Sequence, residues 1–257
     1  MTARFGSRDG APYVAVVTGA ARGIGLGIAT RLAQHGLQVA IVDRDRAALD
    51  EARDALQAQE LRVIAAAADL TRSDEVNAAF AAIERQAGRI DFLVNNAGTV
   101  RDMRFLKMTD DDWDLVIDTN LRSQFLCCRA VLRGMVERKF GRIVNISSRA
   151  WLGGFGQANY SAAKGGVVSL TRSLAIEFAA KGVTVNAVAP GIVDTPLFRG
   201  FADEVQARQR DSVPVKRIGT PEDIALAVEF FLVPAASYVT GQTLYVCGGR
   251  SLSSPSV

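Results

Sequence analysis

The chain has 257 residues, of which 49% are hydrophobic and 22% charged, and its formal net charge is +3. This composition is typical of a soluble globular protein, and so small a charge gives no reason to expect binding to nucleic acid or to a membrane surface. No apolar run approaches the roughly 18 residues of a membrane span, and residues 1–12 lack the apolar stretch of a secretion signal. Three cysteines and one histidine form no disulfide pattern or metal-ligand set, so we expect a cytoplasmic protein without a metal.

Short apolar runs alternate along the chain with longer segments of helical periodicity. Most runs are apolar on both faces, as in a sheet covered by helices on each side. The expected strands are 13–17, 38–42, 62–65, 91–94, 142–146, 183–188 and 243–246, and the expected helices are 24–36, 46–59, 73–87, 111–139, 159–180 and 221–232. This alternation predicts an α/β fold with one doubly wound, parallel, seven-stranded sheet. Without a linker or composition break, we expect a single domain, 1–257, with flexible tails at 1–11 and 250–257.

A glycine-rich loop follows the first expected strand and opens the first helix. Its glycines, Gly19, Gly23 and Gly25, would let backbone N–H groups approach a pyrophosphate at the positive end of the helix. The spacing Gly-x-x-x-Gly-x-Gly differs from the commoner Gly-x-Gly-x-x-Gly, and glycines alone can mark a structural turn. Their place between a strand and a helix favours a nucleotide site.

Asp43 ends the second expected strand. An acidic side chain there can bind a ribose 2′-hydroxyl and repel a 2′-phosphate, which favours NAD over NADP. A solvated loop aspartate is the alternative, with Arg22 and Arg44 nearby as phosphate partners. Asp69 and Leu70, after the third strand, could border an adenine or belong to an ordinary strand-to-helix cap.

Tyr160 and Lys164 are spaced i, i+4 on the fifth expected helix. This spacing places the phenol and the ammonium on one helical face, where the cation would lower the pKa of the tyrosine toward the range of an acid/base catalyst. Most isolated pairs of this kind are surface contacts. Here the pair occurs together with Asn95-Asn96-Ala97-Gly98 after the fourth strand and Ser147-Ser148 after the fifth.

In this combination the chain resembles the short-chain dehydrogenase/reductase family, in its 3-oxoacyl-reductase-like subgroup. The motifs span the chain from about Val14 to Gly249 and comprise Thr18 to Gly25, Asn95 to Gly98, Asn120, Ser147-Ser148, Tyr160-x-x-x-Lys164 and Pro190-Gly191-Ile192-Val193-Asp194-Thr195. The resemblance implies a Rossmann-type fold, a nicotinamide cofactor and a homotetramer.

The resemblance also implies a role for each matching residue. Tyr160 would be the general acid/base, and a serine would hydrogen-bond the substrate oxygen. Lys164 would hold the nicotinamide ribose and depress the pKa of Tyr160, and Asn120 would order a water that links Lys164 to solvent. The expected cofactor contacts, Tyr160 and Lys164 included, come from the strand ends and the loops that follow: Gly19, Arg22, Gly23, Ile24, Gly25, Asp43, Asp69, Leu70, Asn96, Ala97, Gly98, Pro190, Gly191, Ile192 and Thr195.

Two alignments disagree on the serine. Counting back from Tyr160 by the usual family spacing gives Ser147, whereas alignment on the strand before it gives Ser148. Because a loop absorbs a deletion more easily than a strand absorbs a register shift, we choose Ser148.

We therefore expect an oxidoreductase that transfers a hydride between NAD(H) and a secondary alcohol or ketone. NADP-dependent reduction of a 3-oxoacyl thioester is the alternative, and a catalytically silent NAD-binding regulatory protein is a remote one. The candidate contacts for an anionic or aromatic substrate are Arg149, Trp151, Arg101 and Arg104. The polar segment 196–213 is expected to form a lid over the substrate.

Overall fold

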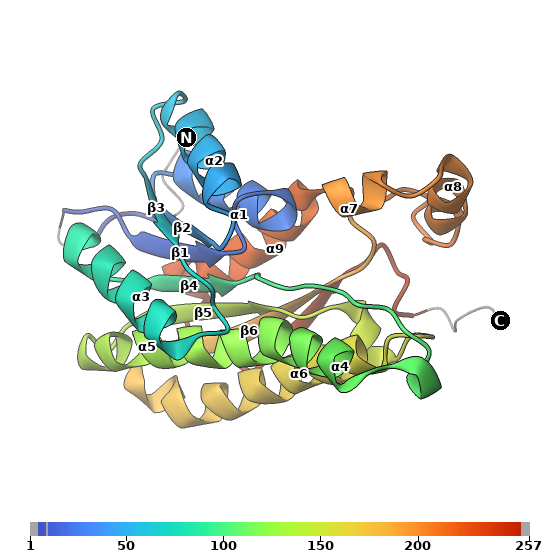
Figure 1. Cartoon of the computed structure of the whole chain (residues 1–257). Helices are drawn as coiled ribbons and strands as arrows, with labels where there is room; N and C mark the ends of the chain where they lie inside the picture. Colours follow the sequence, from blue (N-terminus) through green and yellow to red (C-terminus); the bar gives the residue numbers. More distant parts are fainter. Residues whose placement is uncertain (1–4, 9, 253–257) are drawn as a thin grey trace.

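The computed structural model describes residues 5–8 and 10–252, in which a seven-stranded parallel sheet lies between two layers of helices (Figure 1). The strands are β1 (Val14–Thr18), β2 (Gln38–Asp43), β3 (Val63–Ala67), β4 (Phe92–Asn95), β5 (Gly141–Ile146), β6 (Val183–Pro190) and β7 (Thr243–Val246). Their order, β3-β2-β1-β4-β5-β6-β7, reverses between β1 and β4. Ligands of such sheets bind outside the carboxyl ends of the strands at this reversal. The predicted fold class is confirmed.

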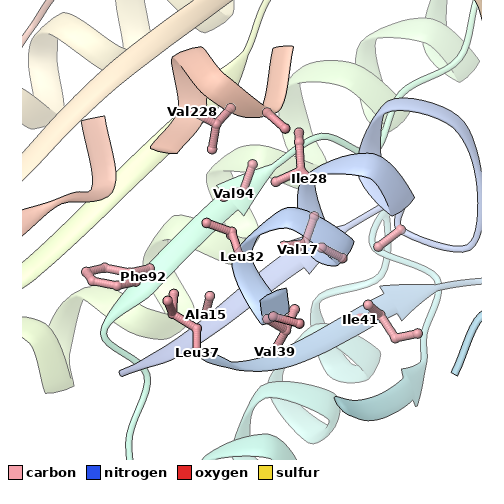
Figure 2. Packing of buried hydrophobic residues seen from close by; sticks show 14 of the residues in the cluster. Ala15, Val17, Ile28, Leu32, Leu37, Val39, Ile41, Phe92, Val94 and Val228 are labelled. Atoms are coloured by element: carbon pink, nitrogen blue, oxygen red, sulfur yellow. The ribbon is translucent and has the colours of Figure 1, made fainter. Parts of the chain in front are cut away.

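The helices divide between the two faces of the sheet (Figure 1). One face carries α1 (Gly23–Gln34), α2 (Arg46–Gln57) and α9 (Pro221–Leu232), and the other carries α3 (Ser73–Ala87), α5 (Ser123–Glu137) and α6 (Ala158–Phe178). On the first face, Ile28 and Leu32 of α1 and Val228 of α9 pack with Val17 and Val94 of the central strands (Figure 2). Each such buried side chain contributes about 1.5–3 kcal/mol, so the strand ends are held on a rigid platform.

The single helix expected over 111–139 is interrupted. In the structure α4 (Asp110–Ile117) runs into a π-helical turn, Asp118–Arg122, before α5 begins. Asn120 in this turn is fully buried, and its amide donates to the carbonyls of Thr99 and Val116. π-turns are frequent at functional sites, where the extra residue re-aims a side chain. The apolar periodicity on either side does not reveal the inserted residue, which is why the sequence suggested one helix.

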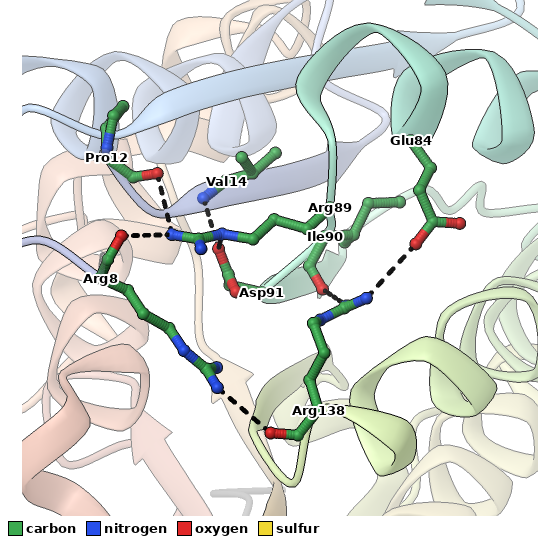
Figure 3. A network of polar contacts seen from close by, with 8 residues as sticks. All are labelled: Arg8, Pro12, Val14, Glu84, Arg89, Ile90, Asp91 and Arg138. Atoms are coloured by element: carbon green, nitrogen blue, oxygen red, sulfur yellow. Dashed lines mark hydrogen bonds and ion pairs between the residues drawn. The ribbon is translucent and has the colours of Figure 1, made fainter. Parts of the chain in front are cut away.

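The described part of the expected N-terminal tail is packed against the body (Figure 3). Phe5 is 5% exposed, and the Arg8 guanidinium donates to the Arg138 carbonyl. Arg89 donates to the Arg8 carbonyl and forms an ion pair with the fully buried Asp91. Residues 5–8 are therefore held in place, because an aromatic ring and a guanidinium group anchor them. Residues 1–4 and 9 of that tail, and 253–257 of the C-terminal one, lie outside the described residues.

The expected lid segment contains two short helices, α7 (Pro196–Arg199) and α8 (Asp203–Asp211). No residue of α8 is buried, and the helix projects away from the sheet in Figure 1. Short 3₁₀ helices occur at Phe105–Lys107, Arg149–Leu152, Ala179–Lys181 and Pro234–Ala236. Within the described ranges, none of the helices combines the length and the apolar character that crossing a membrane requires.

Candidate active site

Tyr160 and Lys164 lie one turn apart near the start of α6. The ammonium nitrogen of Lys164 lies 5.5 Å from the centre of the Tyr160 ring and donates a 3.0 Å hydrogen bond to the Ile146 carbonyl. Lys164 is 3% exposed, and Tyr160 is half-buried. Since Ile146 ends β5, the pair sits at the sheet edge where ligands of this fold bind.

Burial governs the ionisation of both groups. It lowers the pKa of Lys164 to about 7 and raises the pKa of Tyr160, an increase that a hydrogen bond with Ser148 opposes and the Asp102 carboxylate reinforces. The expected lowering of the Tyr160 pKa by Lys164 is therefore not found. The reason is that the ammonium is itself desolvated and is directed to the Ile146 carbonyl, so the loss of water around the phenol outweighs its effect.

The two serines after β5 face different groups. Ser147 is 2% exposed and donates a 2.9 Å hydrogen bond to the Lys164 carbonyl inside α6. The Ser148 hydroxyl accepts the Ala150 N–H at 3.1 Å and also hydrogen-bonds with the Tyr160 phenol. Of the two hydroxyls, the one of Ser148 is thus directed to the Tyr160 phenol.

Asn120 and Lys164 meet above Gly98. The side-chain oxygen of Asn120 is buried and has no hydrogen-bond partner among the described residues. A Cβ at Gly98 would lie 2.6 Å from this oxygen and 3.4 Å from the Lys164 ammonium nitrogen. An unsatisfied buried acceptor costs about 1–3 kcal/mol and is the kind of atom that an ordered water satisfies. The arrangement therefore fits the water-ordering role implied for Asn120.

The glycine-rich loop and the 95–98 turn are joined by hydrogen bonds. The Asn96 amide donates to the carbonyls of Thr18 and Gly19, and the Thr18 hydroxyl accepts the N–H groups of Asn96 and Ala97. Gly19 has φ +62°, and a Cβ on Gly25 would collide with the Gly19 carbonyl. No side chain caps the N-terminus of α1. A close-packed glycine loop before an uncapped helix fits a phosphate group, so the loop can hold a dinucleotide.

Asp43 lies beside this loop at the end of β2. Its carboxylate accepts the N–H groups of Ala21 at 3.3 Å and Asp45 at 3.2 Å. Arg22 forms an ion pair with Asp45. The carboxylate of Asp43 therefore borders the nucleotide loop, and the guanidinium of Arg22 has an acidic partner of its own.

The other expected cofactor contacts lie on both sides of the crevice. Asp69 accepts hydrogen bonds from the N–H and the hydroxyl of Thr71, and the Leu70 side chain is buried in the core. This turn is thus engaged in structure, and a contact from Leu70 would come from its backbone. Opposite, Thr195 caps α7, and a Cβ on Gly23 would lie 3.6 Å from its methyl group. The segment that leaves β6 therefore reaches the glycine loop; its expected contacts there are Pro190, Gly191, Ile192 and Thr195.

The four candidate substrate contacts have different surroundings. The Arg101 guanidinium forms a 2.9 Å ion pair with Asp112, whereas Arg104 lies over the exposed ring of Phe155. Arg149 donates a 3.3 Å hydrogen bond to the Arg250 carbonyl. The ring of Trp151 stacks on that of Tyr245 at 6.4 Å. Arg101 is thus engaged within the protein.

Asn159 is a site residue that the sequence did not single out. It is fully buried, its amide donates to the carbonyls of Arg101 and Asp112, and its oxygen accepts the Tyr160 N–H. Asn159 therefore sets the position of the backbone that carries Tyr160. The one sequence signal is a polar residue in the first turn of a helix, where side-chain caps are common. Its partners are distant in sequence, so the contact itself was not predictable.

Metal ligands do not gather at this site. Across 5–8 and 10–252, no three His, Cys, Asp or Glu side chains form a group that could hold a metal ion.

Similarity to known proteins extends over almost the whole chain. A family model described as enoyl-(acyl carrier protein) reductase matches residues 19–251. The chain is 46% identical to (2S)-[(R)-hydroxy(phenyl)methyl]succinyl-CoA dehydrogenase subunit BbsD of Thauera aromatica, over 93% of this chain and 96% of that one. It is 42% identical to the 3-oxoacyl-[acyl-carrier-protein] reductase FabG of Vibrio cholerae, over 92% and 96%. A crystal structure of an actinorhodin polyketide ketoreductase variant with NADPH superposes with a TM-score of 0.90 at 37% identity, over 93% and 97%.

Proposed function

The chain belongs to the short-chain dehydrogenase/reductase family of oxidoreductases, and we propose that it uses NAD(H) to interconvert a secondary alcohol and a ketone. The observation that carries the proposal is that Tyr160, Ser148 and Lys164 meet at the carboxyl end of β5. The 95–98 turn, which passes beside Lys164, also packs on the glycine-rich loop. The 95–98 turn thus connects the pair of Tyr160 and Lys164 to a loop that fits a dinucleotide.

Residues on both sides of the crevice would hold the cofactor. The backbone of the glycine-rich loop would bind the phosphates, and Asp43 the adenosine ribose. Lys164 would hold the nicotinamide ribose, with Ile192 and Thr195 on the far side. When bound, the nicotinamide supplies or accepts the hydride.

The protein residues manage the proton. In ketone reduction the Tyr160 phenol donates its proton to the substrate oxygen, and in alcohol oxidation the phenolate accepts it. Ser148 holds the same oxygen next to the phenol. The unpaired oxygen of Asn120, above Gly98, would order the water through which Lys164 exchanges protons with solvent.

Asp43 supports NAD as the cofactor, and a fluorescence titration tests it. Wild type is expected to bind NADH more tightly than NADPH. In Asp43→Ala the ratio of the Kd for NADPH to the Kd for NADH is expected to fall about tenfold, because a ribose hydrogen bond and a repulsive charge both disappear. Asp54→Ala, an exposed carboxylate on α2, is the matched control and is expected to keep the preference. Tighter binding of NADPH by wild type would contradict the assignment.

NADP-dependent reduction of a 3-oxoacyl thioester is the second candidate. It is favoured by the 42% identity to a 3-oxoacyl-[acyl-carrier-protein] reductase. Assays of acetoacetyl-CoA and a panel of secondary alcohols with each cofactor separate the two reactions, with Tyr160→Phe as the inactive control. Absence of hydride transfer from every substrate would instead support a silent cofactor-binding protein, a remote reading because Tyr160, Lys164 and Asn120 are all present.

We further propose a homotetramer in the cytoplasm. Large apolar side chains are exposed on two helices and on the last strand of the sheet: Ile176 on α6, Leu226 and Phe230 on α9, and Leu244 on β7. Contact with further copies of the chain would cover them.

A further inference from the structure

Asn159 joins three separate segments of the chain at the start of α6. It directly precedes Tyr160 and is fully buried. Its amide nitrogen donates to the Arg101 carbonyl, in the segment that follows the 95–98 turn, at 3.1 Å and to the Asp112 carbonyl of α4 at 3.0 Å. Its side-chain oxygen accepts the Tyr160 N–H at 2.8 Å. Both amide hydrogens and the oxygen thus bond backbone groups, one in each segment.

The Tyr160 N–H needs an acceptor from outside the helical backbone. It lies in the first turn of α6, where N–H groups have no partner within the helix. The carbonyl four residues earlier, that of Gly156, accepts the Met103 N–H at 2.8 Å. The oxygen of Asn159 is the acceptor for Tyr160 instead, and it fixes the backbone from which the phenol extends.

Asn120 bridges two of these segments in the same way. Its amide donates to the carbonyls of Thr99 and Val116, both at 2.8 Å. Thr99 lies two residues before Arg101 in the chain. Val116 lies one helical turn after Asp112, so both acceptors of α4 are on one face of the helix. The Arg101–Asp112 ion pair, at 2.9 Å, joins the same two segments. Two buried amides and an ion pair therefore hold this stretch of chain against α4.

The bridge formed by Asn159 relates the phenol to the cofactor side of the candidate site. Residues 99–101 directly continue the 95–98 turn, which packs on the glycine-rich loop. Through Asn159, the same residues hold the start of α6. Proton transfer requires the phenol within hydrogen-bond distance of the reacting oxygen, so a displacement of about 1 Å at Tyr160 can slow the reaction about a hundredfold.

We propose that Asn159 is a positioning residue, which holds the Tyr160 phenol in register with the cofactor side of the site by tying α6 to residues 99–101 and to α4. The inference rests on the proposed role of Tyr160 as proton carrier. Asn159 acts through the backbone. Without it, the Tyr160 N–H and the carbonyls of Arg101 and Asp112 lose their shared partner. The first turn of α6 is then free to shift against residues 99–101.

Two variants of Asn159 and a matched control separate positioning from stability. Asn159→Ala removes all three hydrogen bonds, and Asn159→Ser keeps a hydroxyl donor and acceptor in place of the amide. Asn186→Ala is the control. Asn186 is also fully buried, and it joins the Val239 carbonyl, at 2.9 Å, to the Gln242 N–H, at 3.1 Å. Both asparagines therefore tie backbone groups of separate segments together, and of the two Asn159 is the one that adjoins Tyr160.

Steady-state kinetics measure the consequence for the reaction that wild type catalyses. In Asn159→Ala, kcat per folded enzyme is expected to fall about a hundredfold while the Kd for NADH stays at the wild-type value, because the phenol is displaced and the glycine-rich loop is not. The solvent isotope effect on kcat should rise, since proton transfer becomes slower than the other steps. Asn159→Ser should lie between Asn159→Ala and wild type. Asn186→Ala is expected to lose thermal stability but to keep the wild-type kcat and isotope effect.

Hydrogen–deuterium exchange measures the bridge without turnover. In Asn159→Ala, the backbone N–H groups of both 99–104 and 158–164 are expected to exchange faster than in wild type, because the hydrogen bonds that join the two segments are gone. Asn186→Ala should keep wild-type exchange in both segments.

The inference would be overturned by wild-type kcat in folded Asn159→Ala and Asn159→Ser, or by unchanged exchange of residues 99–104 in these variants. An equal fall of kcat in Asn186→Ala would also contradict it. If wild type converts no alcohol or ketone, the proposed function is contradicted instead, and the exchange experiment still decides whether Asn159 ties the two segments together.

Discussion

At the residue scale, the burial of Lys164 lowers the stability of the folded protein. Its ammonium is 3% exposed, and burial lowers its pKa from 10.5 to about 7. The unfolded chain therefore binds this proton more tightly than the folded one. The resulting loss of stability is absent above about pH 10.5, grows as the pH falls toward 7 and is constant below. A buried lysine that lowers the stability of the fold is consistent with a functional role.

Replacing Lys164 with an apolar side chain of similar length is expected to stabilise the fold. Lys164→Met should raise the free energy of unfolding by about 4 kcal/mol at pH 7 and progressively less toward pH 10, while turnover falls to background. Urea unfolding across this pH range measures the effect, and Lys181→Met, at an exposed position, serves as control. A gain that does not depend on pH would contradict the assigned cause.

The two serines give a second prediction at this scale. Ser148→Ala should lower kcat about a hundredfold, since it removes the donor that we propose holds the substrate oxygen beside Tyr160. Ser147→Ala should leave kcat nearly unchanged and cost about 1 kcal/mol of stability, because its hydroxyl bonds the Lys164 carbonyl. Steady-state kinetics with the reverse ranking would show that Ser147 is the catalytic serine.

At the element scale, the site depends on how closely the loops after β1 and β4 approach. The contact is filled by Gly19, Gly25 and Asn96, and a Cβ on either glycine would clash with the neighbouring backbone. Similarly, the π-turn between α4 and α5 brings Asn120 to Gly98 and Lys164. The expected glycine loop, turn and asparagine thus lie together, while the hydrogen bonds that join them come from Thr18 and Asn96.

A pair of glycine substitutions tests this close approach. Gly25→Ala is expected to cost about 1–3 kcal/mol and to weaken NADH binding at least tenfold, because its Cβ would push the loop away from Asn96. Gly165→Ala in α6, where a Cβ meets nothing within 4 Å, should be neutral or stabilise by up to about 1 kcal/mol. Thermal unfolding and a fluorescence titration measure both. Normal NADH affinity in Gly25→Ala would argue against a phosphate site there.

At the scale of the whole molecule, the parallel sheet brings the candidate site residues together at the carboxyl ends of its strands. Residues that follow β1, β2, β4, β5 and β6 all lie at the carboxyl ends of these strands, beside the reversal between β1 and β4. Two buried clusters, one on each face, hold the strands in register. The same architecture leaves apolar side chains of the outer helices exposed, which is the basis of the proposed homotetramer.

Light scattering after gel filtration tests the assembly. Wild type should have four times the chain mass, and Ile176→Glu should form smaller species, since a carboxylate replaces an apolar side chain that is 84% exposed on α6. Leu106→Glu, at a position 97% exposed outside the proposed contacts, is expected to remain tetrameric. A monomeric wild type would contradict the proposal.

The sequence by itself determined the sheet, its helices and the motifs at the strand ends, because strand and helix periods and glycine-rich turns are local patterns. It also pointed to Tyr160, Lys164 and Asn120 by their spacing and their resemblance to a family. Only the tertiary structure showed which serine hydroxyl reaches Tyr160 and where the π-turn interrupts the long helix. It also reversed the expected pKa shift of Tyr160. These properties depend on burial and on contacts between distant segments, which local patterns do not contain.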